Sequence, residues 1–414
     1  MTIPTEQLLN LSGIRVLSVS YDEDKMECEI ESTQGYALCH KCGRQATHFH
    51  EHEKALVLRH LPLCGRTVIL RLRPKRYRCP HCEGGVTTTE RQDWYDAKAG
   101  CTKVFAEILL LELVNSTLQD VARKHGVTYD VARGVLQRYV RREVDWSSID
   151  TLRLLGLDEI SLLKGHGDFV TIVSAQDQQG KPLVLAVLKG REKKTVVEFL
   201  QTIPAHLQKT IQEVCSDLYE GFLGAVAEVL PAARLVADRF HVTKLYRAAV
   251  DALRKVEMKE LKSLLKKEEF VCLKGVLWAL RKKREDLEPA EKETLDLLFA
   301  CSPQLQQAYR LREKLTRLFD NEQHTKEAGR QALRRWMTEV KNSGLDCFDK
   351  FLATLEKRMD IITNYFTNRT TSGWVEGLNN KIKVLKRRCY GLRNLPNLFR
   401  RLWLDLHGYE AFAH

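Results

Sequence analysis

Three strand-like runs that each lead directly into an aspartate constrain the fold of this chain most strongly. The runs and their acids are residues 154–157 with Asp158, 213–216 with Asp217, and 234–237 with Asp238. Short apolar runs bounded by polar residues are typical of buried strands. Because an unpaired buried charge is costly, an acid at the end of such a strand needs a partner. Taken alone, Asp158 could cap a turn or pair with a lysine, but three acids in equivalent positions favour a shared site.

The surrounding segment, residues 151–245, alternates strand and helix patterns in the manner of an α/β domain. Parallel strands bring their carboxyl ends to one edge of a sheet, where α/β proteins form their sites. We therefore expect the three aspartates to lie close together. Glu159 follows Asp158, and strand alternation points it to the opposite face, which makes it a less suitable ligand. The expected strands are 154–161, 169–175, 182–188, 213–216 and 234–237, and a helix is expected over 195–207.

Residues 246–366 show no strand pattern and are rich in Leu, Lys, Arg and Glu. Their apolar positions recur at helical spacing, so we expect an all-helical block, either a separate domain or an insertion into the α/β fold. Trp278 and Trp336 are expected in its core rather than as base-stacking residues. The predicted helices cover 246–267, 270–283, 289–300, 303–319, 326–341 and 346–366.

Two Cys-x-x-Cys pairs near the N-terminus predict a metal site. The pairs are Cys39 with Cys42 and Cys79 with Cys82. A two-residue gap lets one tight turn aim both thiolates at the same ion, and four cysteines complete a tetrahedral Zn²⁺ site. Such a closed site would fold the domain rather than catalyse. The alternative is a set of buried thiols. The other eight of the 12 cysteines are scattered singly and are expected to be reduced.

The chain around these pairs has strand patterns. Residues 1–38 alternate apolar and polar side chains and predict a β-hairpin that leads to the first pair. A stretch of 36 residues (43–78) separates the two pairs. We expect strands at 56–58 and 68–72 to fill it as part of the zinc ribbon.

Residues 103–142 change to helical periodicity and predict three helices. Ser116-Thr117-Leu118-Gln119 matches a capping-box start for the second helix, Thr128 stands where the N-cap of the third is expected, and Gly126 where a turn requires glycine. This pattern is typical of a helix-turn-helix, which places its second helix in the major groove of DNA. A plain helical hairpin is the alternative, but the net charge of +12 favours DNA. The residues expected to contact DNA here are Tyr129, Arg133, Gln137, Arg138 and Arg141.

A further capped helix is expected from Ser372 onward, with Glu376 in its first turn. Between residues 377 and 404 there is no Asp or Glu, whereas Lys and Arg accumulate. A carboxylate at the head of such a basic face suits a metal ion beside a phosphate backbone, although Glu376 could simply favour a helix N-terminus. The residues expected to contact the phosphates are Lys383, Arg387 and Arg388.

Asp158, Asp217 and Glu376 together offer three hard oxygen ligands. Oxygen ligands select Mg²⁺ or Mn²⁺, and two such ions roughly 4 Å apart can promote the attack of water or a 3′-hydroxyl on a phosphodiester. The order strand-Asp, hairpin, helix, strand-Asp, helix, strand, helix-Glu is that of the ribonuclease-H-like nucleases.

With these features, the chain resembles the DDE-type insertion-sequence transposases of the ISL-three family. The segments that carry the resemblance are GLDEIS at 156–161, Ser216-Asp217, VADRFHVTKLYRAAVDALR at 236–254 and VEGLNNKIKVLKRRCYGLRN at 375–394. Trp374 departs from the smaller or polar residue expected before Val-Glu-Gly.

The resemblance implies roles for individual residues. Asp158, Asp217 and Glu376 would be the catalytic triad that binds Mg²⁺ or Mn²⁺. Asp238 and His241 form the Asp-x-x-His pair of transposases with a helical insertion before the final Glu, and they would support the active site or the DNA strand.

The resemblance extends over nearly the whole chain and implies a multidomain α/β protein. A ribonuclease-H-like catalytic core would be interrupted by an all-helical insertion and preceded by a zinc ribbon and a helix-turn-helix. The expected domains are the zinc ribbon (1–100), the helix-turn-helix (101–148), the first part of the core (149–245), the insertion (246–368) and the C-terminal part of the core with its basic tail (369–414).

The implied function is that of a DNA transposase that binds terminal inverted repeats, cleaves DNA and joins the ends to target DNA. Because two ends must be brought together, a homodimer or larger synaptic assembly is expected. No apolar run is long enough for a transmembrane helix and no secretory signal is apparent, so we expect a bacterial cytoplasmic, nucleoid-associated protein. The alternatives are a domesticated, non-catalytic DNA-binding regulator and a structure-specific nuclease with the same core.

Overall fold

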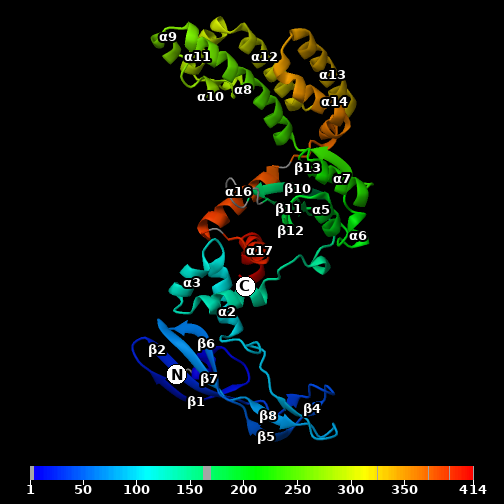
Figure 1. The fold of residues 1–414 in the computed structure, drawn as a ribbon. Coiled ribbons are helices and arrows are strands. Elements are labelled where there is room, and N and C mark those ends of the chain that lie inside the picture. Colours follow the sequence, from blue (N-terminus) through cyan, green and yellow to red (C-terminus); the bar gives the residue numbers. More distant parts are fainter. Residues whose placement is uncertain (1–3, 162–168, 324, 372, 391, 414) are drawn as a thin grey trace. The chain divides into compact units, whose positions relative to one another are not determined.

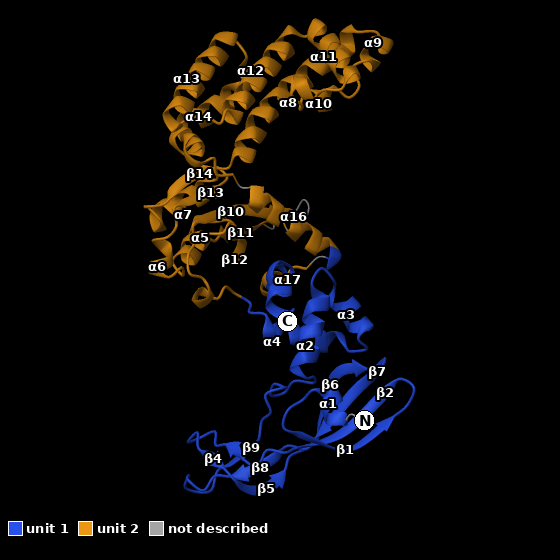
Figure 2. Ribbon diagram, turned by 180° about the vertical axis from the view of Figure 1, so that it is seen from behind, with its two compact units in different colours: residues 1–142, 388–390, 400–414 blue, residues 143–387, 391–399 orange. Residues whose placement is uncertain are grey.

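The computed structural model describes residues 4–161, 169–323, 325–371, 373–390 and 392–413. The chain divides into two compact units (Figure 2). In the described residues, no helix combines the length and apolar character needed to cross a membrane. Unit 1 comprises Met1–Arg142, Arg388–Tyr390 and Arg400–His414, and unit 2 comprises Glu143–Arg387 and Gly391–Phe399.

Unit 1 contains a four-stranded sheet in the order β1-β2-β7-β6. The predicted N-terminal hairpin is present as β1 and β2, and β2 continues the sheet by pairing in parallel with β7. A short helix, α1, precedes the sheet (Figure 2). The bounds are Thr5–Leu9 for α1, Ile14–Tyr21 for β1, Lys25–Ser32 for β2, Leu56–Leu63 for β6 and Arg66–Leu72 for β7.

The strands expected at 56–58 and 68–72 are present as β6 and β7, and they join the N-terminal hairpin in this sheet. Leu58 of β6 and Leu70 of β7 are 1% and 0% exposed and share a core with Cys28 and Ile30 of the N-terminal hairpin. Apolar side chains alternate along both hairpins, so that pairing β2 with β7 places them on the same face of one sheet. The two cysteine pairs lie in turns that directly follow two short strands, β3 and β8, outside this sheet. The short strands of this region are Ala37–Leu38 (β3), Gln45–Ala46 (β4), His48–His52 (β5), Lys75–Arg78 (β8) and Thr87–Thr89 (β9).

Helices make up the rest of unit 1. Apolar residues of α2, α3 and α4 form a core to which Leu404 of the C-terminal helix α17 contributes. Arg401 of α17 is 2% exposed and donates to the carbonyl oxygens of Leu113 (2.8 Å) and Ser116 (2.7 Å). These bonds tie α17 to the end of α2 and to the turn that follows it. The bounds are Lys103–Leu113 (α2), Leu118–Lys124 (α3), Tyr129–Tyr139 (α4) and Leu395–Phe412 (α17).

Unit 2 is built on a five-stranded sheet in the order β12-β11-β10-β13-β14. The first three strands are antiparallel neighbours, and β10, β13 and β14 run parallel (Figure 1). All five expected strands are therefore present. Their bounds are Leu154–Ser161 (β10), Phe169–Gln176 (β11), Pro182–Lys189 (β12), Glu213–Ser216 (β13) and Arg234–Ala237 (β14).

Helices α5 and α7 pack beside each other with the sheet, and a one-turn helix α6 lies between them in sequence. The single helix expected over 195–207 is divided, because Pro204 lacks the amide hydrogen that would continue α5. A 3₁₀ turn at Trp146–Ser148 precedes the sheet. The helix bounds are Lys193–Leu200 (α5), Ala205–Gln208 (α6) and Glu220–Val229 (α7).

A block of helices follows β14 and shares one hydrophobic core. The described residues from 239 to 371 contain no strand, as expected. Trp336 is 1% exposed, as predicted, but Trp278 is 63% exposed, because its one-turn helix turns Val276 and Ala279 toward the core instead. The helices are Arg239–Leu264 (α8), Lys267–Val271 (α9), Val276–Ala279 (α10), Pro289–Cys301 (α11), Pro303–Asp320 (α12), Lys326–Ser343 (α13), Asp349–Thr363 (α14) and Tyr365–Asn368 (α15), with 3₁₀ turns at Arg284–Asp286 and Asp346–Phe348.

Helix α16, Gly373–Arg388, returns the chain to the sheet; its predicted start at Ser372 lies outside the described residues. The segment before it is tied to the start of β13, because the buried Glu213 carboxylate accepts from Asn368 Nδ2 (2.8 Å) and from the Thr370 hydroxyl. Gly156 of β10 makes room for the first turn. A Cβ atom there would lie 2.5 Å from Val375 Cγ2 and 2.8 Å from the Trp374 ring.

We predict that Gly156→Ala destabilises unit 2 by about 1–3 kcal/mol, because the added methyl group overpacks the contact between β10 and α16. The urea-unfolding midpoint followed by tryptophan fluorescence measures the effect. Gly134→Ala is the matched control, since a Cβ at that α4 position meets nothing within 4 Å and alanine favours a helix. Equal midpoints for the two variants would contradict the close packing at Gly156.

Candidate active site and metal centre

Asp158 and Asp217 lie at neighbouring positions on the carboxyl edge of the parallel strands. Leu157 of β10 pairs with Ser216 of β13, and each of these residues directly precedes one of the two aspartates. Asp238 follows β14, and its amide donates to Ser216 O at 2.8 Å. The strand register therefore brings the three predicted acids to one edge.

Burial makes this edge unfavourable for negative charge. Both Asp158 and Asp217 have pKa values raised above the usual range for aspartate, mainly because burial removes water from the carboxylates. Backbone amides oppose the effect: Glu159 N donates to Asp158 at 2.8 Å, and Tyr219 N donates to Asp217 at 3.0 Å. The two carboxylates also repel each other. A bound cation would offset both this repulsion and the loss of water.

His241 supplies positive charge to this cluster. Its Nδ1 lies 2.7 Å from Oδ2 of Asp238, and this hydrogen bond raises the pKa of His241, with further contributions from Asp158 and Asp217. Asp238 is 3% exposed and also caps α8 by accepting from Phe240 N at 3.0 Å. The pair therefore couples the start of α8 to the acidic edge.

Sequence reasoning missed a contact from α16. Asn379 is 6% exposed, and its Nδ2 donates to Oδ2 of Asp158. Its Oδ1 has no hydrogen-bond partner within the described part of the chain. The predicted ligand Glu376 lies three residues earlier, so the two side chains share a helical face. That spacing was visible in the sequence, but asparagine carries no charge and gave no signal by itself.

Glu376 itself is exposed in the first turn of α16. Among the described residues, only the four predicted cysteines form a group of three or more His, Cys, Asp or Glu side chains at metal-ligand spacing. The triad is thus not assembled as a closed ligand set, although α16 reaches Asp158 through Asn379. Glu159 is engaged elsewhere, since Arg191 Nη1 donates to it at 2.8 Å.

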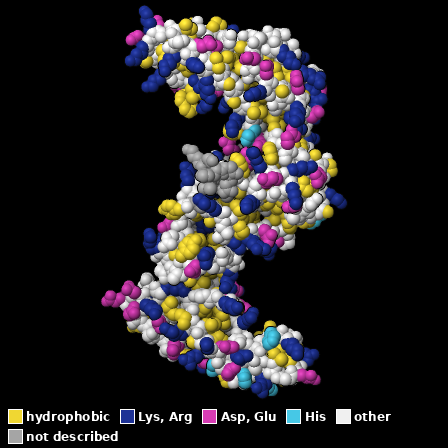
Figure 3. Space-filling model, in the orientation of Figure 1, with side chains coloured by type: hydrophobic (Ala, Val, Ile, Leu, Met, Phe, Trp, Pro, Cys, Tyr) yellow, Lys and Arg dark blue, Asp and Glu magenta, His cyan; other side chains and the backbone are white. Residues whose placement is uncertain are grey.

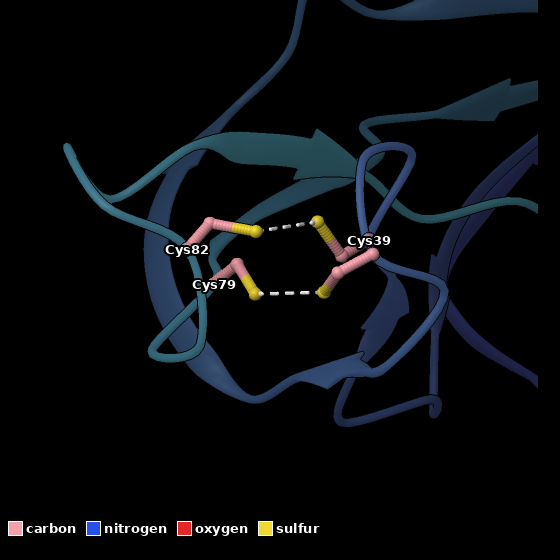
Figure 4. Close-up of side chains that lie close together, drawn as sticks. Cys39, Cys79 and Cys82 are labelled. Atoms are coloured by element: carbon pink, nitrogen blue, oxygen red, sulfur yellow. Dashed lines mark hydrogen bonds between the residues drawn. The ribbon is translucent and has the colours of Figure 1, made fainter.

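The four cysteines of the predicted zinc site do converge. Their sulfur atoms all lie within 4.8 Å of one another, with Cys39 Sγ 3.9 Å from Cys82 Sγ and Cys42 Sγ 3.6 Å from Cys79 Sγ. Figure 4 shows the thiols pointing toward one centre from two turns. Tetrahedral Zn²⁺ with Zn–S bonds of about 2.3 Å separates its sulfur ligands by roughly 3.8 Å. The spacing therefore fits one zinc ion.

Thiol electrostatics also favour a cation at this place. Backbone amides of Cys42 and Lys41 lower the pKa of Cys39, whereas the neighbouring sulfur of Cys42 and burial raise the pKa of Cys82. One site thus holds a thiol that ionises readily beside one that resists ionisation. Zn²⁺ stabilises all four as thiolates, so the geometry and the donor set together support structural zinc.

The predicted DNA-contacting residues, Tyr129, Arg133, Gln137, Arg138 and Arg141, are all exposed on or just after α4. Thr128 caps α4 as expected, the predicted capping-box segment 116–119 caps α3 through Thr117, and Gly126 has φ +60°. Arg133 pairs with Asp130 (2.8 Å). Arg138 donates to Ala97 O (2.9 Å).

The three cations predicted on the last basic helix differ in their surroundings. Lys383 and Arg387 are exposed on α16. Arg388 instead makes an ion pair with Asp405, whose side chain is 1% exposed, and its Nη1 lies 3.5 Å from Asn115 Oδ1. Arg388 is therefore occupied within unit 1.

We predict that the N-terminal domain binds one zinc ion per chain and needs it to fold. Cys39→Ser, or removal of the metal by a chelator, should abolish zinc binding measured by metal analysis and lower the melting temperature. Cys64→Ser is the matched control, because Cys64 is exposed and outside the cluster. A chain that retains its zinc after Cys39→Ser would contradict the four-cysteine site.

Comparisons with known proteins agree with this arrangement. A model for the zinc finger of transposases IS204, IS1001, IS1096 and IS1165 matches residues 36–82. The transposase for insertion sequence element IS1001 of Bordetella parapertussis is 28% identical over 404 residues, 96% of each chain. The transposase for IS1557 of Mycobacterium tuberculosis (strain H37Rv) is 25% identical, over 90% of this chain and 86% of that protein.

A solved structure, the Drosophila P element transposase strand transfer complex, aligns with a TM-score of 0.40 and 12% identity over 73% of this chain and 91% of that chain. The ISL3 transposase model matches residues 155–402, which is more than half of the chain and contains all three predicted catalytic acids. The chain therefore belongs to the ISL3 family of transposases.

Proposed function

We propose that this protein is a DNA transposase that binds the terminal inverted repeats of an insertion sequence and catalyses metal-dependent strand cleavage and strand transfer. The observation that carries the proposal is the pair of half-buried aspartates, Asp158 and Asp217, on adjacent parallel strands within the region matched by the transposase family. The relatives named as insertion-sequence transposases extend over nearly the full chain.

The parts of the chain would divide the work. The sheet order β12-β11-β10-β13-β14, with α16 packed on β10, supports a ribonuclease-H-like catalytic core. Helices α8 to α15 would be its insertion. The zinc ribbon and the helix pair α3–α4 would read the inverted repeats, with Tyr129, Arg133 and Gln137 at the groove. Recognition of two ends calls for a homodimer or larger assembly, acting on DNA in the cytoplasm.

Asp158, Asp217 and Glu376 would hold Mg²⁺ or Mn²⁺, because hard carboxylate oxygens suit these ions and the two half-buried aspartates need positive charge. When bound, the cation would supply Lewis-acid chemistry for attack on the phosphodiester. Glu376 would complete the ligand set from the first turn of α16. Lys383 and Arg387 on the same helix would bind the phosphate backbone.

The surrounding polar residues would position the acids. Asn379 orients the Asp158 carboxylate through its Nδ2 hydrogen bond. Asp238 holds His241 with its charge toward the acidic edge. Residues that orient metal ligands in this way typically contribute about 10–100-fold to metal affinity or activity.

The direct test is cleavage of inverted-repeat DNA by the full-length protein with Mg²⁺. Asp158→Ala, Asp217→Ala and Glu376→Ala should each lower the cleavage rate by at least about 100-fold, because each removes a metal ligand. Their affinity for the same DNA should remain close to that of the wild type. Glu159→Ala is the matched control, since this adjacent acid pairs with Arg191 instead.

Three other outcomes have distinct meanings. Wild-type cleavage rates in all three triad variants would refute the mechanism. Binding without metal-dependent cleavage by the wild type would indicate a DNA-binding regulator. Cleavage of branched DNA in preference to inverted repeats would indicate a structure-specific nuclease.

We also predict that Asn379→Ala weakens Mn²⁺ binding by about 10–100-fold, because the Asp158 carboxylate loses the donor that orients it. Isothermal titration with Mn²⁺ measures this effect independently of catalysis. Asn380→Ala is the control, since Asn380 is exposed at the next position. Equal Mn²⁺ affinities in the two variants would show that the hydrogen bond has no positioning role.

A further inference from the structure

The helical block contains a second cluster of charge, outside the candidate active site. A small cleft, with a free volume of about 10 Å³, lies between α8, the segment around α10, and α12, with Val250 and Leu280 among its apolar lining residues. Four arginines line it, and they come from all three elements. These are Arg247, Arg254, Arg281 and Arg312, which we call the arginine cleft.

Arg312 lies at the base of this cleft and is 1% exposed. Its Nη1 and Nη2 donate to the carbonyl oxygens of Arg281 (3.0 Å) and Lys282 (2.7 Å). Its buried Nε has no partner among the described residues. Burial lowers the pKa of Arg312, Tyr309 and Glu313 partly oppose this effect, and the nearby charge of Arg247 adds to it. The cleft therefore concentrates like charges where water is partly excluded.

Acidic residues neutralise only part of the cleft. Arg312 Nη2 lies 4.0 Å from the Glu313 carboxylate. Asp251 is the single acidic lining residue, and its carboxylate accepts from Arg254 (2.8 Å) and pairs with Lys255 (3.1 Å). Arg247 and Arg281 make no ion pair in the part of the chain that the structure describes. The surplus charge therefore stays available to an anion.

The basic residues next to Arg281 in the sequence differ from it in having acidic partners. The three residues that follow Arg281 each have an acidic partner within 3.0 Å. The pairs are Lys282 with Glu291, Lys283 with Asp320 and Arg284 with Asp296. The absence of such a partner at Arg281 is thus local, and it coincides with the cleft.

An exposed aromatic ring stands beside the cleft. The Arg281 guanidinium lies 5.1 Å from the ring centre of Trp278, which is 63% exposed. Figure 3 shows hydrophobic side chains beside Lys and Arg side chains at the end of the block that carries α10 and α11. A stacking surface next to arginines is the combination that nucleic-acid-binding sites use for bases and phosphates.

We propose that the arginine cleft binds a phosphate of the DNA backbone and that Trp278 contacts the adjacent sugar or base. Guanidinium groups suit phosphate oxygens because they present several fixed donors, and Arg312 supplies a buried, positioned charge. The proposal rests on the proposed function, which makes DNA the substrate. It adds a DNA-binding surface in the helical block, distinct from α4 and α16.

The test is DNA binding by the full-length protein as a function of KCl concentration, with inverted-repeat DNA as the probe. The double variant Arg247→Ala/Arg281→Ala should bind roughly tenfold more weakly, and the slope of log Kd against log salt should fall by about 1 for each phosphate that the variant no longer neutralises. Arg334→Ala/Arg335→Ala is the matched control, because both residues are exposed on α13, away from the cleft. The control should keep the wild-type slope.

Trp278 gives an independent readout. The fluorescence difference between the wild type and Trp278→Phe isolates this one indole, and DNA should quench it. Quenching should disappear in the Arg247→Ala/Arg281→Ala variant.

The failures are distinguishable. If wild-type protein binds DNA while the cleft and control variants share its affinity and slope, the cleft proposal is wrong and the proposed function stands. If inorganic phosphate raises the melting temperature of the wild type but not of the cleft variant, and DNA affinity is equal in both, the cleft holds a free anion instead. Wild-type protein that binds no DNA overturns both proposals.

Discussion

The partial burial of two like charges on adjacent strands is the constraint on which the organisation of unit 2 depends. Asp158 lies in β10 and Asp217 directly follows β13, and removal of water raises the pKa of both. An edge of this kind is stable only where donors and positive charge converge on it. Backbone amides, His241 and Asn379 provide this compensation from three different elements. Through these contacts, the start of α8 and the middle of α16 meet the same sheet edge.

Local patterns in the sequence predicted much of this arrangement. Apolar runs that end in an acid identified β10, β13 and β14, and the two Cys-x-x-Cys spacings identified the thiol cluster. The apolar runs and the Cys-x-x-Cys pairs are both short-range signals. Each can be recognised within a few consecutive residues. The resemblance to a transposase family was then confirmed by the family match.

Pairing between distant segments was harder to predict. Nothing local shows that β2 pairs in parallel with β7 rather than leaving β7 to the zinc ribbon. Charge was equally ambiguous, because the run of Lys and Arg near the C-terminus mixes exposed and buried roles. Lys383 is exposed, whereas Arg401 is buried and donates a hydrogen bond to the Leu113 carbonyl oxygen at the end of α2. Composition records the number of cations but does not tell which of them face solvent.

The hairpin β6–β7 lies in the chain between the two cysteine pairs, yet it belongs to the neighbouring sheet. The metal therefore closes a loop whose middle is anchored in another hydrophobic core. Loop closure is entropically easier when the intervening chain is already ordered. Zinc affinity and the stability of the β1-β2-β7-β6 sheet are thus thermodynamically linked. A destabilising substitution in the core of that sheet, far from any sulfur, would therefore lower the affinity for the metal. Metal binding would in turn stabilise the sheet.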